Sequence, residues 1–200
     1  MRKNKGGKKA KKNILDYYSL SWTFIKQCRN YILLGFLVFL FSMFLGVTFP
    51  QIFEEKLVEY LSALFGSIDG FGFWELFAFI FKNNASSAFT SVLFGIFFGI
   101  YPLFSMILNG YVLGFVAIRS VEVGGLRVLW QLVPHGILEL PAIFLSVGLG
   151  IKLGFSLFTH LGRKSFGSSF KDAFTVFFFV VLPLLFLAAL IETALILMSG

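Results

Sequence analysis

The sequence has a single cysteine, Cys28, two histidines and few charged residues, which make up 14% of its 200 residues. One cysteine excludes an internal disulfide and any cysteine-based metal cluster. The sequence has no His-Glu-x-x-His, no G-x-S-x-G and no G-x-x-x-x-G-K segment, which are marks of zinc hydrolases, serine hydrolases and phosphate-binding loops. We therefore expect no catalytic residues, no metal and no cofactor, and predict that the protein is not an enzyme.

What the sequence has in abundance is apolar mass. Hydrophobic residues make up 58% of the chain, and 29 residues are phenylalanine. Several nearly uncharged runs reach the roughly 17–25 residues that cross the hydrocarbon core of a bilayer. The sequence predicts an all-α, multi-pass transmembrane helical bundle of about five spans with interfacial amphipathic helices.

Basic residues are concentrated at the N-terminus. Nine of the first 30 residues are Lys or Arg, against one Asp, and the formal net charge is +7. Basic residues before a first span hold the cytoplasmic side and attract anionic lipid, and no nucleic-acid-binding motif accompanies them. We expect a disordered basic arm over residues 1–13 and one membrane domain over 14–200. The first apolar run begins near Tyr31, too far into the chain for a signal peptide.

Hydropathy and proline positions give the expected elements. Residues 14–30 and the acidic segment after Pro50 have the mixed pattern of interfacial helices, and 71–81 is a short interfacial segment with Trp74. The nearly uncharged stretch 85–120 is too long for one span, and Pro102 divides it. The predicted spans are 31–49, 85–101, 103–119, 133–158 and 174–198.

The number of passes also fits the charges of the loops. The loop from His160 to Lys171 is basic, so it is expected on the cytoplasmic side with the N-terminus. Five passes satisfy this condition and place the C-terminus outside. The expected location is the cell membrane.

Polar residues inside the expected spans are the candidate functional residues, because an ionisable group in a membrane is costly. His135 and Glu139 lie four residues apart between Pro134 and Pro141, which places them on one helix face. The predicted topology gathers these residues in the outer third of the membrane, with Asn109 deeper: His135, Glu139, Glu192, Arg119, Asn83 and Asn84.

Arg119 is expected to pair with Glu139 or Glu192, which would lower the cost of burying either charge. Two interpretations of the polar group stay open. The polar residues can satisfy one another and hold the helices in register. Alternatively, they form an outward-facing pocket for a lipid headgroup, a glycan or a small solute. Three pairs of glycines spaced four apart predict close helix packing within the chain or across a dimer: Gly95/Gly99, Gly110/Gly114 and Gly150/Gly154.

These motifs resemble a known family. The sequence from about residue 30 to 198, above all Pro134-His135-Gly136-Ile137-x-Glu139-x-Pro141-Ala142, is similar to the stage II sporulation protein M family. The resemblance implies a five-span membrane protein with a cytoplasmic N-terminus. The family's namesake acts in the engulfment machinery of spore-forming bacteria with membrane-anchored peptidoglycan-degrading partners, which implies a scaffold. Relatives in organisms that make no spores prevent a direct transfer of the sporulation role.

Two hypotheses of function follow. The first is a non-enzymatic membrane protein that scaffolds or organises a membrane complex, as a homo-oligomer or with membrane protein partners. The second is a small transporter or lipid-handling protein that uses a polar pocket around His135 and Glu139.

Overall fold

The protein is described by a computed structural model that covers residues 13–127, 129, 133–157 and 166–199. The side chains of 133–135, 137, 138 and 199 lie outside the described part, as does nearly all of the predicted basic arm, residues 1–12. The described residues form helices and turns without a strand, which confirms the predicted all-α class. The elements are α1 (Ile14–Thr48), η1 (Pro50–Ile52), α2 (Glu54–Ile68), α3 (Phe73–Phe94), α4 (Ile100–Gly124), α5 (Val133–Ser156), α6 (Phe166–Val176), η3 (Phe177–Val181) and α7 (Leu182–Ser199).

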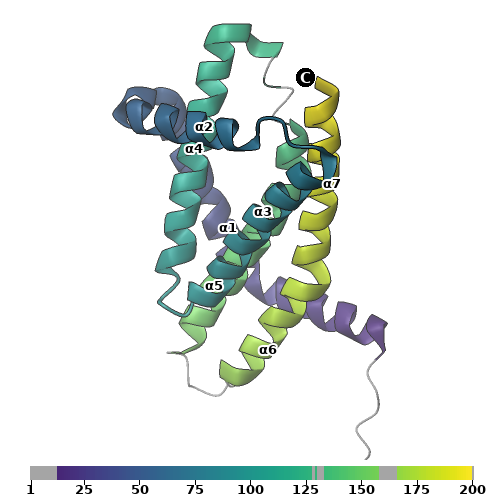
Figure 1. Cartoon of the computed structure of the whole chain (residues 1–200). Coiled ribbons are helices and arrows are strands. Elements are labelled where there is room, and N and C mark those ends of the chain that lie inside the picture. Colours follow the sequence, from purple (N-terminus) through teal and green to yellow (C-terminus); the bar gives the residue numbers. More distant parts are fainter. Residues whose placement is uncertain (1–12, 128, 130–132, 158–165, 200) are drawn as a thin grey trace, which may run out of the picture.

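Five segments run between the two ends of an elongated bundle (Figure 1). α1 begins at the lower end and rises to α2, which lies across the upper end. α3 returns downward, α4 rises, α5 descends, and the continuous unit of α6, η3 and α7 rises again. The start of α1, the end of α5 and the start of α6 therefore lie at the same end of the bundle, as the predicted order of passes requires.

α1 is a single helix, although the sequence suggested an interfacial helix over 14–30 before a span over 31–49. Asn13 and Asp16 form a capping box at its start, where the Asn13 backbone N–H donates to Asp16 Oδ2 at 2.8 Å. Its first turns also pack onto the last ascending unit, since the Tyr17 and Phe179 rings stack at 4.9 Å. With a favourable cap and a packed first half, the chain has no reason to break before residue 31.

α3 corrects two further expectations, a short interfacial segment over 71–81 and a separate span beginning at Ala85. One helix runs from Phe73 to Phe94 instead. Its first half is packed into the bundle, because Leu76 and Ile80 form a buried cluster with Ala189 of α7. Glu75, the charge that lowered the hydropathy of 71–81, lies in the first turn and accepts a hydrogen bond from the Gly72 N–H at 2.9 Å.

The turn between α3 and α4 lies before Pro102, not at it. Residues 95–99 form the turn, and Gly99 adopts the left-handed conformation (φ 71°) that glycine tolerates without a steric cost. Pro102 falls in the first turn of α4, where a proline removes no intrahelical hydrogen bond. The chain was thus expected to break near a proline, but it breaks at the preceding glycine.

α1 and α4 run in parallel with their backbones in close approach. A Cβ added at Gly110 would collide with the backbone carbonyl of Phe39, and one at Gly114 with that of Met43. Hydrogen bonds link the helices at the same place: Ser42 Oγ donates to Ile107 O, and Tyr111 Oη to Phe49 O, both at 2.6 Å. The predicted packing role of this glycine pair is confirmed within the chain.

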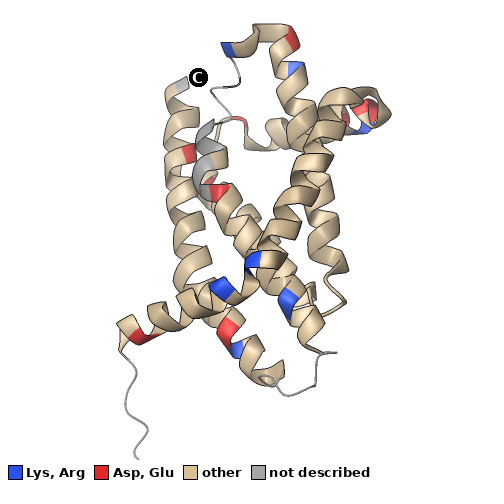
Figure 2. Ribbon diagram, turned by 180° about the vertical axis from the view of Figure 1, so that it is seen from behind, with Lys and Arg blue, Asp and Glu red and all other residues tan. Residues whose placement is uncertain are grey.

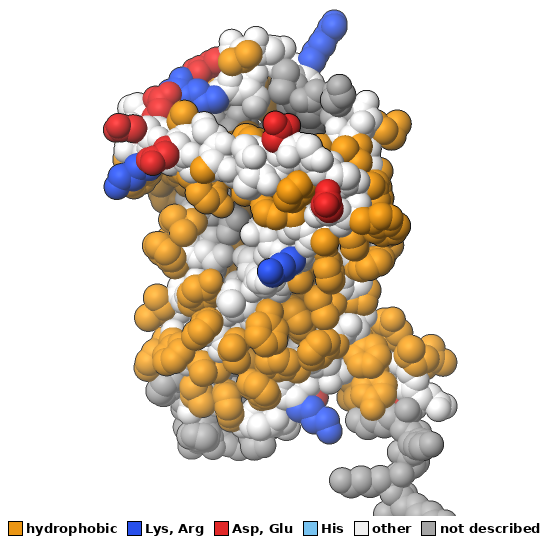
Figure 3. Space-filling view, viewed as in Figure 1, with side chains coloured by type: hydrophobic (Ala, Val, Ile, Leu, Met, Phe, Trp, Pro, Cys, Tyr) orange, Lys and Arg blue, Asp and Glu red, His pale blue; other side chains and the backbone are white. Residues whose placement is uncertain are grey.

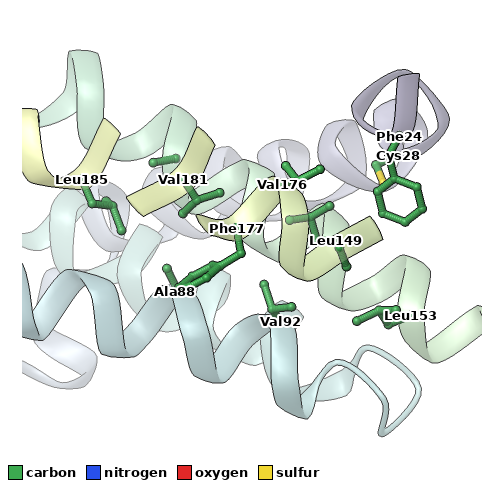
Figure 4. Close-up of a cluster of buried hydrophobic side chains, with 12 residues drawn as sticks. Phe24, Cys28, Ala88, Val92, Leu149, Leu153, Val176, Phe177, Val181 and Leu185 are labelled. Atoms are coloured by element: carbon green, nitrogen blue, oxygen red, sulfur yellow. The ribbon is translucent and has the colours of Figure 1, made fainter. Parts of the chain in front are cut away.

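α3 and α5 also approach closely at glycines. A Cβ at Gly95 would collide with the backbone of Gly150, and one at Gly154 with the carbonyl of Gly95. The hydrophobic core lies beside this contact and joins α1, α3, α5 and the last ascending unit through Phe24, Val92, Leu149 and Phe177 (Figure 4). Packing in this bundle is therefore set by backbone contacts as well as by side chains.

α5 passes through Pro141 without a break, from Val133 to Ser156. The last unit begins at Phe166, eight residues before the expected start of the fifth span. A π-helical turn, Phe177–Val181, ends two residues before Pro183. A wider turn is a usual way to accommodate the missing N–H of a proline in a long helix.

Among the described residues, four helices are long and apolar enough to cross a membrane: Ile14–Thr48, Ile100–Gly124, Glu139–Ser156 and Phe166–Met198. α3 is not one of these four, but it packs at the same depth. Hydrophobic side chains cover much of the lateral surface, and charged groups gather at the end where α2 lies (Figure 3). The molecule is a multi-pass membrane protein.

Candidate functional site

Glu139 is the most deeply buried acidic residue that the structure describes, at 4% exposure. It lies on α5, where the descending helix enters the bundle. A small cavity of about 30 Å³ adjoins it, lined by Phe39, Met106, Asn109, Leu113, Glu139, Leu140 and Ile143. Such a volume accommodates one or two water molecules or a small ion.

Asn109 is the second polar residue at this cavity. Its amide nitrogen donates within its own helix, to Ser105 O at 2.8 Å and to Ser105 Oγ at 3.2 Å. These bonds fix the side chain on α4 and leave its carbonyl oxygen as an acceptor. The structure therefore brings together Glu139 of α5 and Asn109 of α4, which the sequence had placed at different depths.

Asn83 and Asn84 lie on α3, away from the cavity lining. Asn84 is buried at 7% exposure, and Asn83 is exposed and donates to Asn84 Oδ1 at 3.3 Å. One side chain thus faces the bundle and the other its outside. Neither asparagine lines the cavity beside Glu139.

Arg119 corrects the most specific prediction about this group, a pairing with Glu139 or Glu192. Its guanidinium binds Glu54 of α2 and Glu122 of α4, each at 2.6 Å. All three side chains are about one third to one half exposed. Because α2 lies across the end of α4, Arg119 finds carboxylates at the surface, where an ion pair costs little desolvation. The sequence alone did not place α2 there.

Glu192 is half-buried on α7 and does not line the cavity. The side chain of His135 lies outside the described residues, although its backbone belongs to the first turn of α5. Of the predicted group, the structure thus assembles Glu139 and Asn109, and leaves Asn83, Asn84, Arg119 and Glu192 outside the cavity. Within the described part of the chain, no cluster of three or more His, Cys, Asp or Glu could hold a metal.

Lys152 is an intramembrane charge that the sequence analysis passed over. It is half-buried on α5 between Gly150 and Gly154, with its Nζ 5.2 Å from the centre of the Phe24 ring. A cation over an aromatic face is stabilised by the ring quadrupole. A single Lys within the apolar run 143–158 was the signal that could have revealed it.

The arrangement defines a class of protein: a multi-pass helical membrane protein with close-packed glycine contacts and a small cavity between a buried carboxylate and an amide. The chain matches the family described as stage II sporulation protein M over residues 32–195 and belongs to that family. This confirms the resemblance suggested by the Pro134–Ala142 segment.

A curated relative gives no activity. An uncharacterized protein of Methanocaldococcus jannaschii is 32% identical over 89 residues, which are 44% of this chain and 38% of that protein. The chain thus covers well under half the length of this relative. No solved structure matches the chain.

Proposed function

We propose that this chain is a non-enzymatic scaffold that organises a membrane complex in the cell membrane. The observation that carries the proposal is the backbone-to-backbone packing at Gly114 of α4 and Gly150 of α5. Helices in such contact cannot slide or separate without losing it, because interiors this dense have few alternative arrangements. A rigid bundle suits a protein that holds others in place.

The charges at the two ends support an orientation with the N-terminus in the cytoplasm and the C-terminus outside. The first half of α1 carries Lys26 and Arg29, and α6 carries Lys171. Most acidic residues lie toward the opposite end of the bundle, where α2 lies (Figure 2). Positive residues favour the cytoplasmic side. The basic N-terminal arm would add attraction to anionic lipid there, with no role in binding nucleic acid.

A transporter or lipid-handling function is the second candidate, and the buried Glu139 with its cavity favours it. Buried carboxylates in membrane helices serve as proton or cation sites in many transporters. The cavity volume of about 30 Å³ suits a proton, a small ion or water best.

Two measurements distinguish the candidates. The first extracts the chain from its native membrane into lipid nanodiscs without detergent and determines their mass and composition. A scaffold is expected with stoichiometric protein partners or further copies of itself, and particles holding one chain alone would refute this function.

The second measurement follows proton and cation flux into liposomes containing the purified chain, with Glu139→Gln as the variant and Glu122→Gln, a surface carboxylate, as the matched control. The scaffold predicts no flux above that of protein-free liposomes. Flux that disappears only with Glu139→Gln would establish the transporter instead.

A further inference from the structure

Part of the outward face of α3 is polar. Ala78, Lys82, Asn83 and Ser86 are all exposed and follow one another at helical spacing. α1, by contrast, exposes large apolar residues such as Leu37 (54%) and Phe41 (65%). The face defined by these four residues is here called the α3 polar face.

The packing of α3 places this face at membrane depth. Phe77 and Phe81 contact the ring of Phe186 on α7 at 5.2 and 5.7 Å, and Gly95 touches Gly150 on α5. α3 is therefore held alongside two helices that are apolar enough to span a membrane. Lys82 follows nine residues after the start of α3, about 14 Å along the helix. In a hydrocarbon core of about 30 Å this position is close to the middle.

No other part of the described chain compensates the charge of Lys82. The ion pairs among the described residues are those of Arg119, and Lys82 is in none of them. In Figure 3, which views the molecule from the side that α3 occupies, a basic group stands at mid-height, with hydrophobic side chains below it and an acidic group above it. A cation exposed to lipid at this depth is unfavourable, and membrane proteins usually cover or pair such groups.

We propose that the α3 polar face is the docking site for a transmembrane helix of a partner protein that carries a carboxylate near mid-membrane. Lys82 pairs with this carboxylate, and Asn83 and Ser86 hydrogen-bond across the contact. The small side chains of Ala78 and Ser86 let the partner backbone come close, as in other membrane helix pairs. This deepens the proposed scaffold function and rests on it.

The same geometry argues against a second copy as the occupant. Membrane dimers with a two-fold axis along the bilayer normal present the same patch on both subunits. Docking through this face would then bring the Lys82 side chains of both subunits together in a medium of low dielectric, where like charges repel strongly. A carboxylate-bearing helix removes that repulsion.

The experiment measures energy transfer in liposomes between the full-length, terminally labelled chain and synthetic transmembrane peptides. The probes are polyleucine helices with a central Glu, a central Lys, or leucine only. The Glu peptide is expected to associate more tightly than the leucine peptide, by on the order of tenfold, the scale of a polar pair between membrane helices. Lys82→Met should remove this preference, whereas Lys26→Met, at the basic end of α1, should keep it.

A charge exchange provides the decisive comparison, because Lys82→Glu should bind the Lys peptide and reject the Glu peptide. Equal binding of the Glu and leucine peptides to the wild-type chain would overturn the proposal. So would self-association that Lys82→Met abolishes, which would identify a second copy as the occupant.

Rapid labelling of Ser86→Cys by a membrane-impermeant maleimide would also overturn it, because the face would then line an aqueous groove. Cys28 is fully buried and does not interfere. The nanodisc measurement tests the scaffold separately: partners that remain bound to Lys82→Met would leave the scaffold intact and refute only this docking site.

Discussion

Replacing Gly114 with alanine should destabilise the bundle more than any single-methyl change on its surface. The new Cβ would collide with the backbone carbonyl oxygen of Met43 and lie 3.0 Å from Val47 N. Favourable carbon contacts need about 3.5–4.0 Å, so α1 and α4 would have to move apart by more than about an ångström to clear the Met43 carbonyl. Both obstacles are backbone atoms, which cannot rotate away as a side chain can.

The magnitude follows from two destabilising contributions, overpacking and a weakened hydrogen bond, and one stabilising contribution, helix propensity. Overpacking a dense interior costs about 1–3 kcal/mol, and separation also lengthens the Ser42–Ile107 hydrogen bond, now 2.6 Å, whose loss in a membrane costs about 0.6 kcal/mol. Replacing a helical glycine with alanine returns up to about 1 kcal/mol of helix propensity. The expected net loss for Gly114→Ala is about 1–2 kcal/mol.

The matched control is Gly66→Ala on α2, where the added Cβ meets nothing within 4 Å. It should leave stability unchanged or slightly raised. Cys28 supplies the assay, because it is the only cysteine and is fully buried. A thiol-reactive dye follows its exposure on heating in detergent. Equal midpoints for the two variants would refute the claim that backbone contact at Gly114 holds α1 against α4.

Three further predictions test individual contacts. Ser42→Ala should lower the stability measured in the Cys28 assay by about 0.6 kcal/mol, the average for hydrogen bonds between membrane helices. Thr48→Val loses only a hydrogen bond within α1 and should have less effect. Glu54→Gln should loosen α2, measured as faster amide exchange in Glu54–Ile68, and change global stability by under about 1 kcal/mol because the pair is partly exposed. Glu139→Leu should fill part of the cavity with apolar atoms and so exclude water from it. Hydroxyl-radical footprinting read by mass spectrometry should then show less oxidation of Leu140, and unchanged oxidation would contradict the cavity assignment.

The multi-pass helical class was predictable because it depends on features that are local in sequence. Long uncharged runs mark most of the spans, and four described helices are long and apolar enough to cross a membrane, close to the five that the sequence predicted. The glycine pairs were predictable for the same reason, since their spacing alone places them on one helix face. Helix class, approximate span number and glycine contacts therefore follow from the sequence.

The boundaries and partners were not predictable, because they depend on tertiary packing. Lys82 and its neighbours lower the hydropathy of α3, so the sequence suggested a break where packing against α7 maintains one helix. Arg119 was expected to pair with Glu139 or Glu192 on the ground of depth alone, and the position of α2 supplied Glu54 instead. Glu139 was found because a buried carboxylate is rare in a membrane helix.

The polar outer face of α3 agrees with the proposed scaffold role. A helix that only filled the bundle would have an apolar outer face, as α1 does, because lipid would be its neighbour. α3 instead carries Lys82 and Asn83 outward while Leu76 and Ile80 hold its inner face against α7. The inner contacts supply the stability that lets a polar surface be carried to membrane depth. A partner helix that covers this face would complete the combination, so α3 is the first place to look for a partner.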